Sequence, residues 1–128
     1  MDAPANIPAE VVSVYDGDTI KVIAHPWPGI SLNTSVRVRG IDTPEIRGKC
    51  QSEKLNAIKA RDQARSFVGT HVILNNIELG KYAGRVIANV LVGDEDLGEF
   101  LINSGLARPY DGGKRKSWCE WCLVAMQV

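Results

Sequence analysis

The sequence lacks an excess of charge of either sign, because its 15 basic and 15 acidic residues give a formal net charge of zero. A protein that coats nucleic acid through charge alone is strongly basic, so the composition argues against that class. An enzyme that must release its product needs less net charge, provided that its basic groups are concentrated locally. One such basic group near the C-terminus consists of Arg108, Lys114, Arg115 and Lys116. It is about equally consistent with a phosphate contact and with a solvated basic loop.

Long hydrophobic runs are also missing from the chain. No segment is apolar enough to span a membrane, so we expect no membrane partner. Residues 1–10 have neither the basic start nor the apolar centre of a secretory signal. The compartment therefore stays open: we expect a secreted or periplasmic protein if a signal has been removed, and a cytoplasmic one otherwise.

Cysteine is scarce, and the three cysteines are Cys50, Cys119 and Cys122. The last two have a C-x-x-C spacing, but a zinc site needs about four ligands, and only Cys50 and two unpaired histidines, His25 and His71, could complete it. A redox motif is also disfavoured, because no βαβ pattern surrounds the pair. We expect one disulfide from Cys50 to Cys119 or Cys122, and free thiols in a reducing compartment.

The length of 128 residues suits one domain, which at this size buries about two thirds of its unfolded surface. A hydrophobic content of 45% argues against general disorder. We expect a flexible N-terminal segment over residues 1–10 and a single domain over residues 11–128, present as a monomer.

Alternating and β-branched segments predict five strands, over residues 11–15, 19–24, 35–39, 72–79 and 85–92. Asp16-Gly17-Asp18 is a natural turn between the first two strands. Pro26-Trp27-Pro28-Gly29 is expected to end the second strand and to open a loop. In the third strand, alternation places Arg37 and Arg39 on the face opposite the valines.

Helical periodicity predicts a helix over residues 52–68, with Ser52 as its cap and Gly69 as its end. One face of this helix carries Ala57, Ala60, Ala64, Phe67 and Val68. A shorter helix begins at Asp94 or Asp96 and runs to Asn103. This order of elements fits a small closed barrel, although periodicity alone does not separate it from other α+β barrels.

Two acidic clusters stand where short apolar runs end: Asp16-Gly17-Asp18-Thr19 and Asp42-Thr43-Pro44-Glu45, with Arg37 just before the second. Carboxylate oxygens suit Ca²⁺ or Mg²⁺, and a guanidinium suits a phosphate. A metal ion with arginine is the usual apparatus of phosphate-ester chemistry. Taken alone, Asp16 and Asp18 are better explained as turn formers and Asp42 as a cap; together with Glu45, Arg37 and Arg85 they favour the metal site.

Several ordered motifs resemble the staphylococcal nuclease (thermonuclease-like) family over residues 11–118. They are Asp16-Gly17-Asp18-Thr19, Arg37-Val38-Arg39-Gly40-Ile41-Asp42-Thr43-Pro44-Glu45, Gly84-Arg85 and Gly105-Leu106-Ala107-Arg108. The resemblance implies a mainly β fold with helices, an OB-fold five-stranded β-barrel with flanking α-helices. It also implies a Ca²⁺-dependent, sugar-nonspecific nuclease that hydrolyses phosphodiester bonds of DNA and RNA and leaves 3′-phosphate ends.

The same resemblance assigns roles to residues. The metal ligands of the family correspond to Asp18, Asp42 and the Thr43 carbonyl, with Asp16 as an outer-shell carboxylate. Its catalytic groups correspond to Arg37, Arg85 and Glu45, which stabilise the phosphoryl oxygens and act on water. Its substrate-binding residues correspond to Lys81, Tyr82 and Tyr110.

Three features depart from the family pattern. Ala83 is inserted between Tyr82 and Gly84, which puts the register of Lys81 and Tyr82 in question. The lysine-rich loop after the glutamate is replaced by Ile46-Arg47-Gly48-Lys49-Cys50-Gln51. The C-terminal helix is shortened to residues 117–128, where Trp118, Trp121 and Leu123 are expected to clamp the barrel rather than to bind a ligand.

Three rival functions remain open at this point. The first is a catalytically silent OB-fold module that binds nucleic acid or a protein partner, and the retained arginines argue against it. The second is a structural or host-interaction protein in which Ca²⁺ serves stability alone. The third is a phosphoesterase that acts on small nucleotides.

Overall fold

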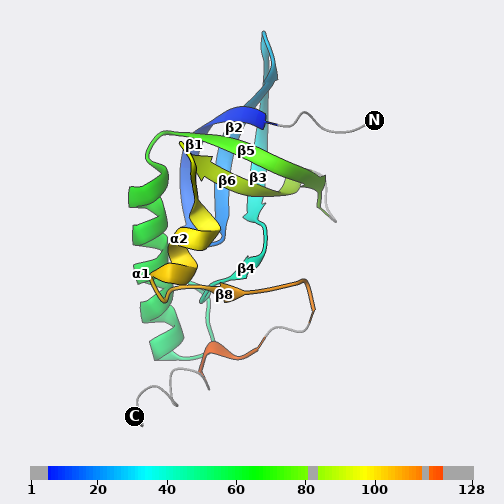
Figure 1. The fold of residues 1–128 in the computed structure, drawn as a ribbon. Helices are drawn as coiled ribbons and strands as arrows, with labels where there is room; N and C mark the ends of the chain where they lie inside the picture. The colour runs from blue at the N-terminus through cyan, green and yellow to red at the C-terminus, as the bar shows by residue number, and fades with distance from the viewer. Residues whose placement is uncertain (1–5, 81–83, 114–115, 120–128) are drawn as a thin grey trace.

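The computed structural model describes residues 6–80, 84–113 and 116–119 of the chain. Its strands are β1 (Asn6–Asp16), β2 (Thr19–Trp27), β3 (Ile30–Val38), β4 (Ile41–Asp42), β5 (His71–Leu79), β6 (Arg85–Val92), β7 (Glu95–Asp96) and β8 (Arg108–Pro109). Its helices are α1 (Gln51–Val68) and α2 (Leu97–Asn103), as Figure 1 shows. Among the described residues, no helix combines the length and apolar character that crossing a membrane requires.

Five strands close into a barrel. Strands β3, β2, β1, β5 and β6 are neighbours in that order, and an additional parallel pairing between β3 and β6 joins the two ends. The other pairings among these strands are antiparallel. The expected five-stranded OB-type barrel with flanking helices is therefore confirmed.

Alternation fills the barrel interior with small and β-branched side chains. On β3 and β6 the buried positions are Val36, Val38, Ala88 and Val90, so the outward positions between them remain for polar groups. Leu97 and Leu101 of α2 belong to the same buried cluster. This interior holds the strands that carry the candidate site in fixed register.

The first strand begins earlier than predicted. Residues 6–10 pair with residues 71–75 of β5, although the sequence analysis placed them in a flexible N-terminal segment. Ile7 and Ala9 alternate with exposed neighbours and are buried, which anchors this part of β1 to the core. This alternation was not recognised in the sequence, because the segment contains Pro8 and few apolar residues.

The β2–β3 connection also differs from the prediction. Strand β2 continues through Trp27, and β3 begins at Ile30, so a tight turn with Gly29 at a φ of 83° replaces the expected loop. The hairpin extends beyond the rest of the barrel at the top of Figure 1. Both of its faces are exposed near the tip, where Trp27 is 70% exposed, and a strand without a buried face lacks the alternation that prediction uses.

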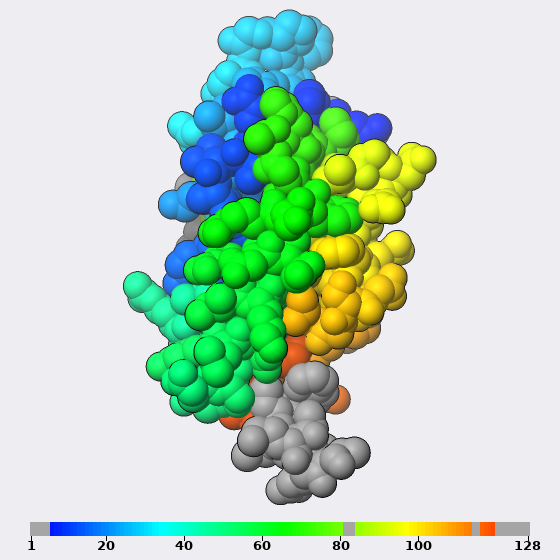
Figure 2. Space-filling view, turned by 90° about the vertical axis from the view of Figure 1, so that its left-hand side faces the viewer, coloured from blue at the N-terminus to red at the C-terminus, as the bar shows by residue number. Residues whose placement is uncertain are grey.

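The helices lie side by side against the barrel (Figure 2). Helix α1 turns its small buried residues toward the core, and these include Ala57, Ala60 and Ala64. The ring centroids of Phe67 and Phe100 lie 4.6 Å apart and join α1 to α2. Gly69 ends α1 as predicted, but its N-cap is Cys50 rather than Ser52.

Candidate active site

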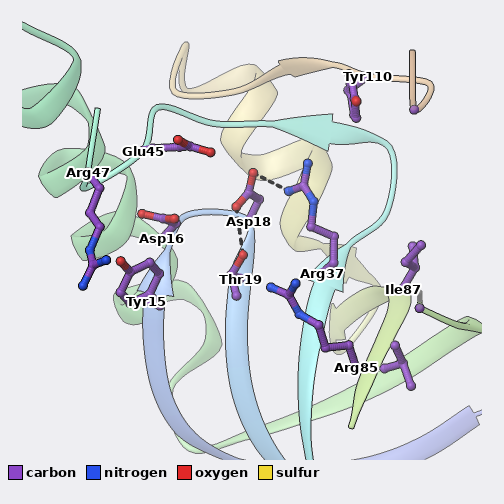
Figure 3. A pocket seen from close by; sticks show the side chains of 13 residues that line it. Tyr15, Asp16, Asp18, Thr19, Arg37, Glu45, Arg47, Arg85, Ile87 and Tyr110 are labelled. Atoms are coloured by element: carbon purple, nitrogen blue, oxygen red, sulfur yellow. Dashed lines mark hydrogen bonds and ion pairs between the residues drawn. The ribbon is translucent and has the colours of Figure 1, made fainter. Parts of the chain in front are cut away.

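A cleft of about 630 Å³ lies outside the barrel, at the end where the β1–β2 turn, β3 and the start of β6 meet. The segments that follow β4 and β8 complete its wall (Figure 3). Six of the residues predicted for the site line this cleft: Asp16, Asp18, Arg37, Glu45, Arg85 and Tyr110. Side chains from five separate segments of the chain are thereby brought together.

The two arginines share a face because of strand register. In the parallel β3–β6 pair, Arg37 lies opposite Ile87 and Arg85 lies opposite Ser35. Residues directly opposite one another, and residues two apart on one strand, point to the same side of a sheet. Arg37 and Arg85 therefore both project outward, and Figure 3 shows their guanidinium groups directed into the cleft.

The acidic turn is fixed by a glycine that has no space for a side chain. A Cβ atom on Gly17 would lie 3.0 Å from the Cβ of Ala60 and 3.1 Å from Cγ2 of Thr43. The turn therefore packs directly on α1 and on the segment after β4, as the close approach of a backbone requires. This contact sets the positions of Asp16 and Asp18.

Asp18 is buried and lies at the centre of the polar contacts. Its Oδ2 forms an ion pair with Nη1 of Arg37 and accepts a hydrogen bond of 3.2 Å from the Thr43 backbone N–H. Its Oδ1 accepts a bond of 3.1 Å from the Thr19 hydroxyl. Arg37 in turn donates through Nη2 to the Ile41 carbonyl at 3.2 Å. A buried carboxylate is stable only with such partners.

Two further carboxylates hold the segment that carries Glu45. Asp16 accepts a hydrogen bond of 2.9 Å at Oδ1 from the Ile46 backbone N–H. Glu53, which is only 7% exposed, accepts bonds of 3.1 Å from the backbone N–H groups of Glu45 and Lys49. Glu53 was not among the residues predicted from the sequence, although an acid in the first turn of a helix after a polar loop is a signal for such a role.

Asp42 lies apart from this cleft. It is 1% exposed and lines a neighbouring cleft of about 520 Å³ with Arg108, Tyr110 and Lys116. Its Oδ2 accepts a hydrogen bond of 3.0 Å from Nε1 of Trp118, and Nη2 of Arg108 lies 3.5 Å from the same oxygen. The predicted ligands Asp42 and Thr43 are therefore not among the residues that line the first cleft, although the Thr43 backbone N–H contacts Asp18.

The cysteine prediction is settled by a disulfide between Cys50 and Cys119. Among the described residues, the group of potential metal ligands whose ligand atoms all lie within 4.8 Å is Cys50, Glu53 and Cys119, and the disulfide occupies both of its sulfur atoms. A zinc site there is therefore excluded in the oxidised chain. Trp118 is buried as the expected clamp, whereas Cys122, Trp121 and Leu123 lie outside the described residues.

The substrate-binding predictions are placed only in part. The Tyr110 ring lies 5.9 Å from Cζ of Arg37, and its hydroxyl donates to the Gly113 carbonyl at 2.5 Å. Lys81, Tyr82 and the inserted Ala83 lie outside the described residues, as do Lys114 and Arg115 of the basic group. The cleft also contains two residues that the sequence analysis did not propose, Tyr15 and Arg47.

The chemistry of the donor set suits a hard cation. Asp16, Asp18 and Glu45 line one cleft and offer oxygen atoms alone, as Ca²⁺ requires. The hydrogen bond between the Thr43 N–H and Asp18 holds the backbone of the second acidic cluster against the first. The carboxylates that line this cleft therefore fit a Ca²⁺ ion.

The comparisons with known proteins agree with this geometry. The family model described as staphylococcal nuclease homologue matches residues 35–121, which is more than half of the chain. No curated protein gives a match. The matched range includes Arg37, Asp42, Glu45 and Arg85, and Asp18, which precedes it, is joined to it by the contacts with Arg37 and Thr43. The chain belongs to the family of staphylococcal nuclease homologues.

Proposed function

We propose that this protein is a Ca²⁺-dependent, sugar-nonspecific nuclease that hydrolyses phosphodiester bonds of DNA and RNA and leaves 3′-phosphate ends. One observation carries the proposal: two arginines, Arg37 and Arg85, face the same cleft as the carboxylates of Asp18 and Glu45. On a fold of this family, that combination offers cations for a phosphate and oxygen atoms for a metal and for water.

In this proposal Asp18, Asp42 and the Thr43 carbonyl would hold the ion, and Asp16 would support them from the outer shell. An ion held there would supply positive charge for the phosphoryl oxygens. Asp16 also accepts the Ile46 N–H at 2.9 Å, which keeps the Glu45 segment beside the acidic turn.

The arginines act on the phosphate. A guanidinium donates two parallel hydrogen bonds to phosphate oxygens, and these bonds strengthen as negative charge develops in the transition state. Arg85 is exposed at the start of β6 and extends into the cleft, while Arg37 is half-buried and held by Asp18 and the Ile41 carbonyl. Removing one donor of this kind costs a factor of about 10²–10³ in rate.

Glu45 acts on water. Its backbone N–H is held by Glu53, so the side chain at the cleft wall starts from a fixed position. A carboxylate so placed accepts a proton from the attacking water or orients it toward phosphorus. The bond from phosphorus to the 5′ oxygen breaks as water adds to phosphorus, so the phosphate stays on the 3′ oxygen. The leaving 5′ oxygen takes a proton from solvent, and the proton accepted from water returns to solvent.

The substrate would lie along the cleft without base recognition. Tyr110 offers a ring on which any base can stack, and Lys81 and Tyr82 are proposed to contact a terminal phosphate. Tyr15 and Arg47 extend the cleft wall beyond Asp16 and Glu45, on the side away from Tyr110 in Figure 3. A single domain that carries all these groups acts as a monomer in this proposal.

The test compares two neighbouring arginines on one strand. Arg37→Ala removes the guanidinium from the cleft, whereas the control Arg39→Ala removes one that contacts the Asn76 carbonyl and Glu78 instead. Denatured DNA and RNA are incubated with each protein in millimolar Ca²⁺, with a chelator as a second control. We expect cleavage to fall about 10²-fold or more in Arg37→Ala, to stay near wild type in Arg39→Ala and to stop with the chelator.

The outcomes separate the proposal from its rivals. A wild-type protein that binds single-stranded DNA but cuts neither DNA nor RNA is a silent binding module. Cleavage of a nitrophenyl nucleotide without cleavage of polymers indicates a small-nucleotide phosphoesterase. Ca²⁺ that raises the unfolding temperature of an inactive protein indicates a structural role for the ion.

A further inference from the structure

The indole of Trp118, near the C-terminus, contacts Asp42 of the second acidic cluster. Trp118 is 3% exposed, and its Nε1 donates to Oδ2 of Asp42 at 3.0 Å. The guanidinium carbon of Arg108 lies 4.1 Å from the centroid of the Trp118 ring, so the arginine packs on the indole while its Nη2 approaches the same carboxylate oxygen. Asp42, at 1% exposure, is thus oriented from two directions at a single oxygen.

A disulfide bond anchors the residue next to this indole. Trp118 is followed directly by Cys119, whose disulfide partner Cys50 is the N-cap of α1. Glu53, three residues into α1, lies 3.8 Å from the Cys119 sulfur and binds the Glu45 backbone N–H. The disulfide therefore joins the segment that contacts Asp42 to the helix end that supports Glu45.

We propose that Trp118 is a positioning residue that sets the Ca²⁺ affinity of Asp42, and that the Cys50–Cys119 disulfide keeps Trp118 in that position. This inference rests on the proposed function, because it takes Asp42 as a ligand of the ion. It adds that the oxidation state of two cysteines outside the cleft controls how strongly the chain binds Ca²⁺.

The physical reason is the orientation of a buried carboxylate. Contacts at Oδ2 fix the plane of the Asp42 side chain and with it the direction of its other oxygen. Without the indole N–H, the carboxylate gains freedom to rotate and loses a charge-assisted hydrogen bond, so the bound geometry becomes less populated. Hydrogen-bond partners of metal ligands contribute a factor of about 10–100 to metal affinity.

The first experiment substitutes the indole with a ring that keeps the packing. Trp118→Phe retains an aromatic face under Arg108 but removes the N–H, and Trp27→Phe, at the exposed hairpin tip, is the matched control. Calcium chloride is titrated into each full-length protein by calorimetry, after circular dichroism has shown that the protein is folded. We expect the Kd for Ca²⁺ to rise about 10-fold or more in Trp118→Phe and to be unchanged in Trp27→Phe.

The second experiment tests whether the disulfide acts through the indole. Cys50→Ser, and separately the double variant Cys50→Ser/Trp118→Phe, are titrated in the same way. If the disulfide serves to hold Trp118, Cys50→Ser alone raises the Kd, but adds little in the Trp118→Phe background. Equal effects of Cys50→Ser in both backgrounds overturn the coupling between the disulfide and the indole.

The results also separate this inference from the proposed function. A wild-type protein that binds Ca²⁺ and cuts DNA, with Trp118→Phe binding Ca²⁺ equally well or more tightly, overturns the inference and leaves the nuclease proposal standing. Absence of Ca²⁺ binding in the wild-type protein overturns both. A raised Kd in Trp118→Phe, with cleavage restored at higher Ca²⁺ concentration, supports the positioning role.

Discussion

The buried carboxylate of Glu53 is expected to stabilise the fold through the segment that carries Glu45. Its two oxygens accept backbone N–H groups from Glu45 and Lys49, both at 3.1 Å. Hydrogen bonds to a charged group contribute about 1.5–3 kcal/mol each, and a buried donor without a partner costs about 1–3 kcal/mol. In Glu53→Gln, one of the two backbone N–H groups bonds to the neutral amide oxygen, and the other faces the side-chain NH₂ group and loses its acceptor. We therefore expect the free energy of unfolding to fall by about 2–4 kcal/mol.

Urea unfolding followed by circular dichroism measures this loss, and a second helix supplies the control. Glu99 lies in the first turn of α2 and is exposed, so Glu99→Gln removes the same charge from an equivalent position relative to the helix dipole. Its expected cost is below about 1 kcal/mol. Gly48→Ala offers an independent check, because its Cβ would lie 2.5 Å from Cδ of Glu53 and displace the same carboxylate. Equal stability losses in Glu53→Gln and Glu99→Gln would refute the reasoning.

Three other outcomes are expected. Gly17→Ala should lower the free energy of unfolding by about 1–3 kcal/mol in urea unfolding, because its Cβ overpacks against α1, and a neutral result would contradict the packing described for the turn. Cys50→Ser, or reduction of the wild-type protein, should cost up to about 4 kcal/mol in the same assay, since the disulfide spans 69 positions of sequence; identical midpoints with and without reductant would contradict this. Arg47→Ala should raise KM for single-stranded DNA with little effect on kcat and reduce the salt slope by about 1, and an unchanged slope would show that Arg47 does not contact phosphate.

Much of the barrel was predictable because its strands are buried on one face. Residues 85–92 are mostly apolar and β-branched, and the predicted strand has the same bounds as β6. The alanine face of α1 and its end at Gly69 were predicted for the same reason. The segments that failed lack that signal: the tip of the β2–β3 hairpin has no buried face, and Cys50 caps α1 through its backbone position rather than through a side-chain hydrogen bond.

The site was predictable where a role depends on residue type and order. The motifs that contain Asp18, Arg37 and Arg85 identified residues that share a cleft, although the parallel pairing that unites the arginines is not encoded locally. Support from distant residues was not predictable in the same way. Trp118 contacts Asp42 although 76 positions separate them in the sequence, and a local sequence pattern does not indicate such a distant partner.

The parallel pairing of β3 with β6 has a consequence for when the cleft is completed during folding. Arg37 and Arg85 come together only when the last strand of the barrel joins the third, a contact between segments far apart in the chain. Such pairings form late, because the entropy of closing the intervening loop must be overcome first. A nascent or truncated chain that ends before β6 therefore has no arginine pair. Under the proposed function, such a chain would not cut the mRNA that encodes it until synthesis has passed that strand.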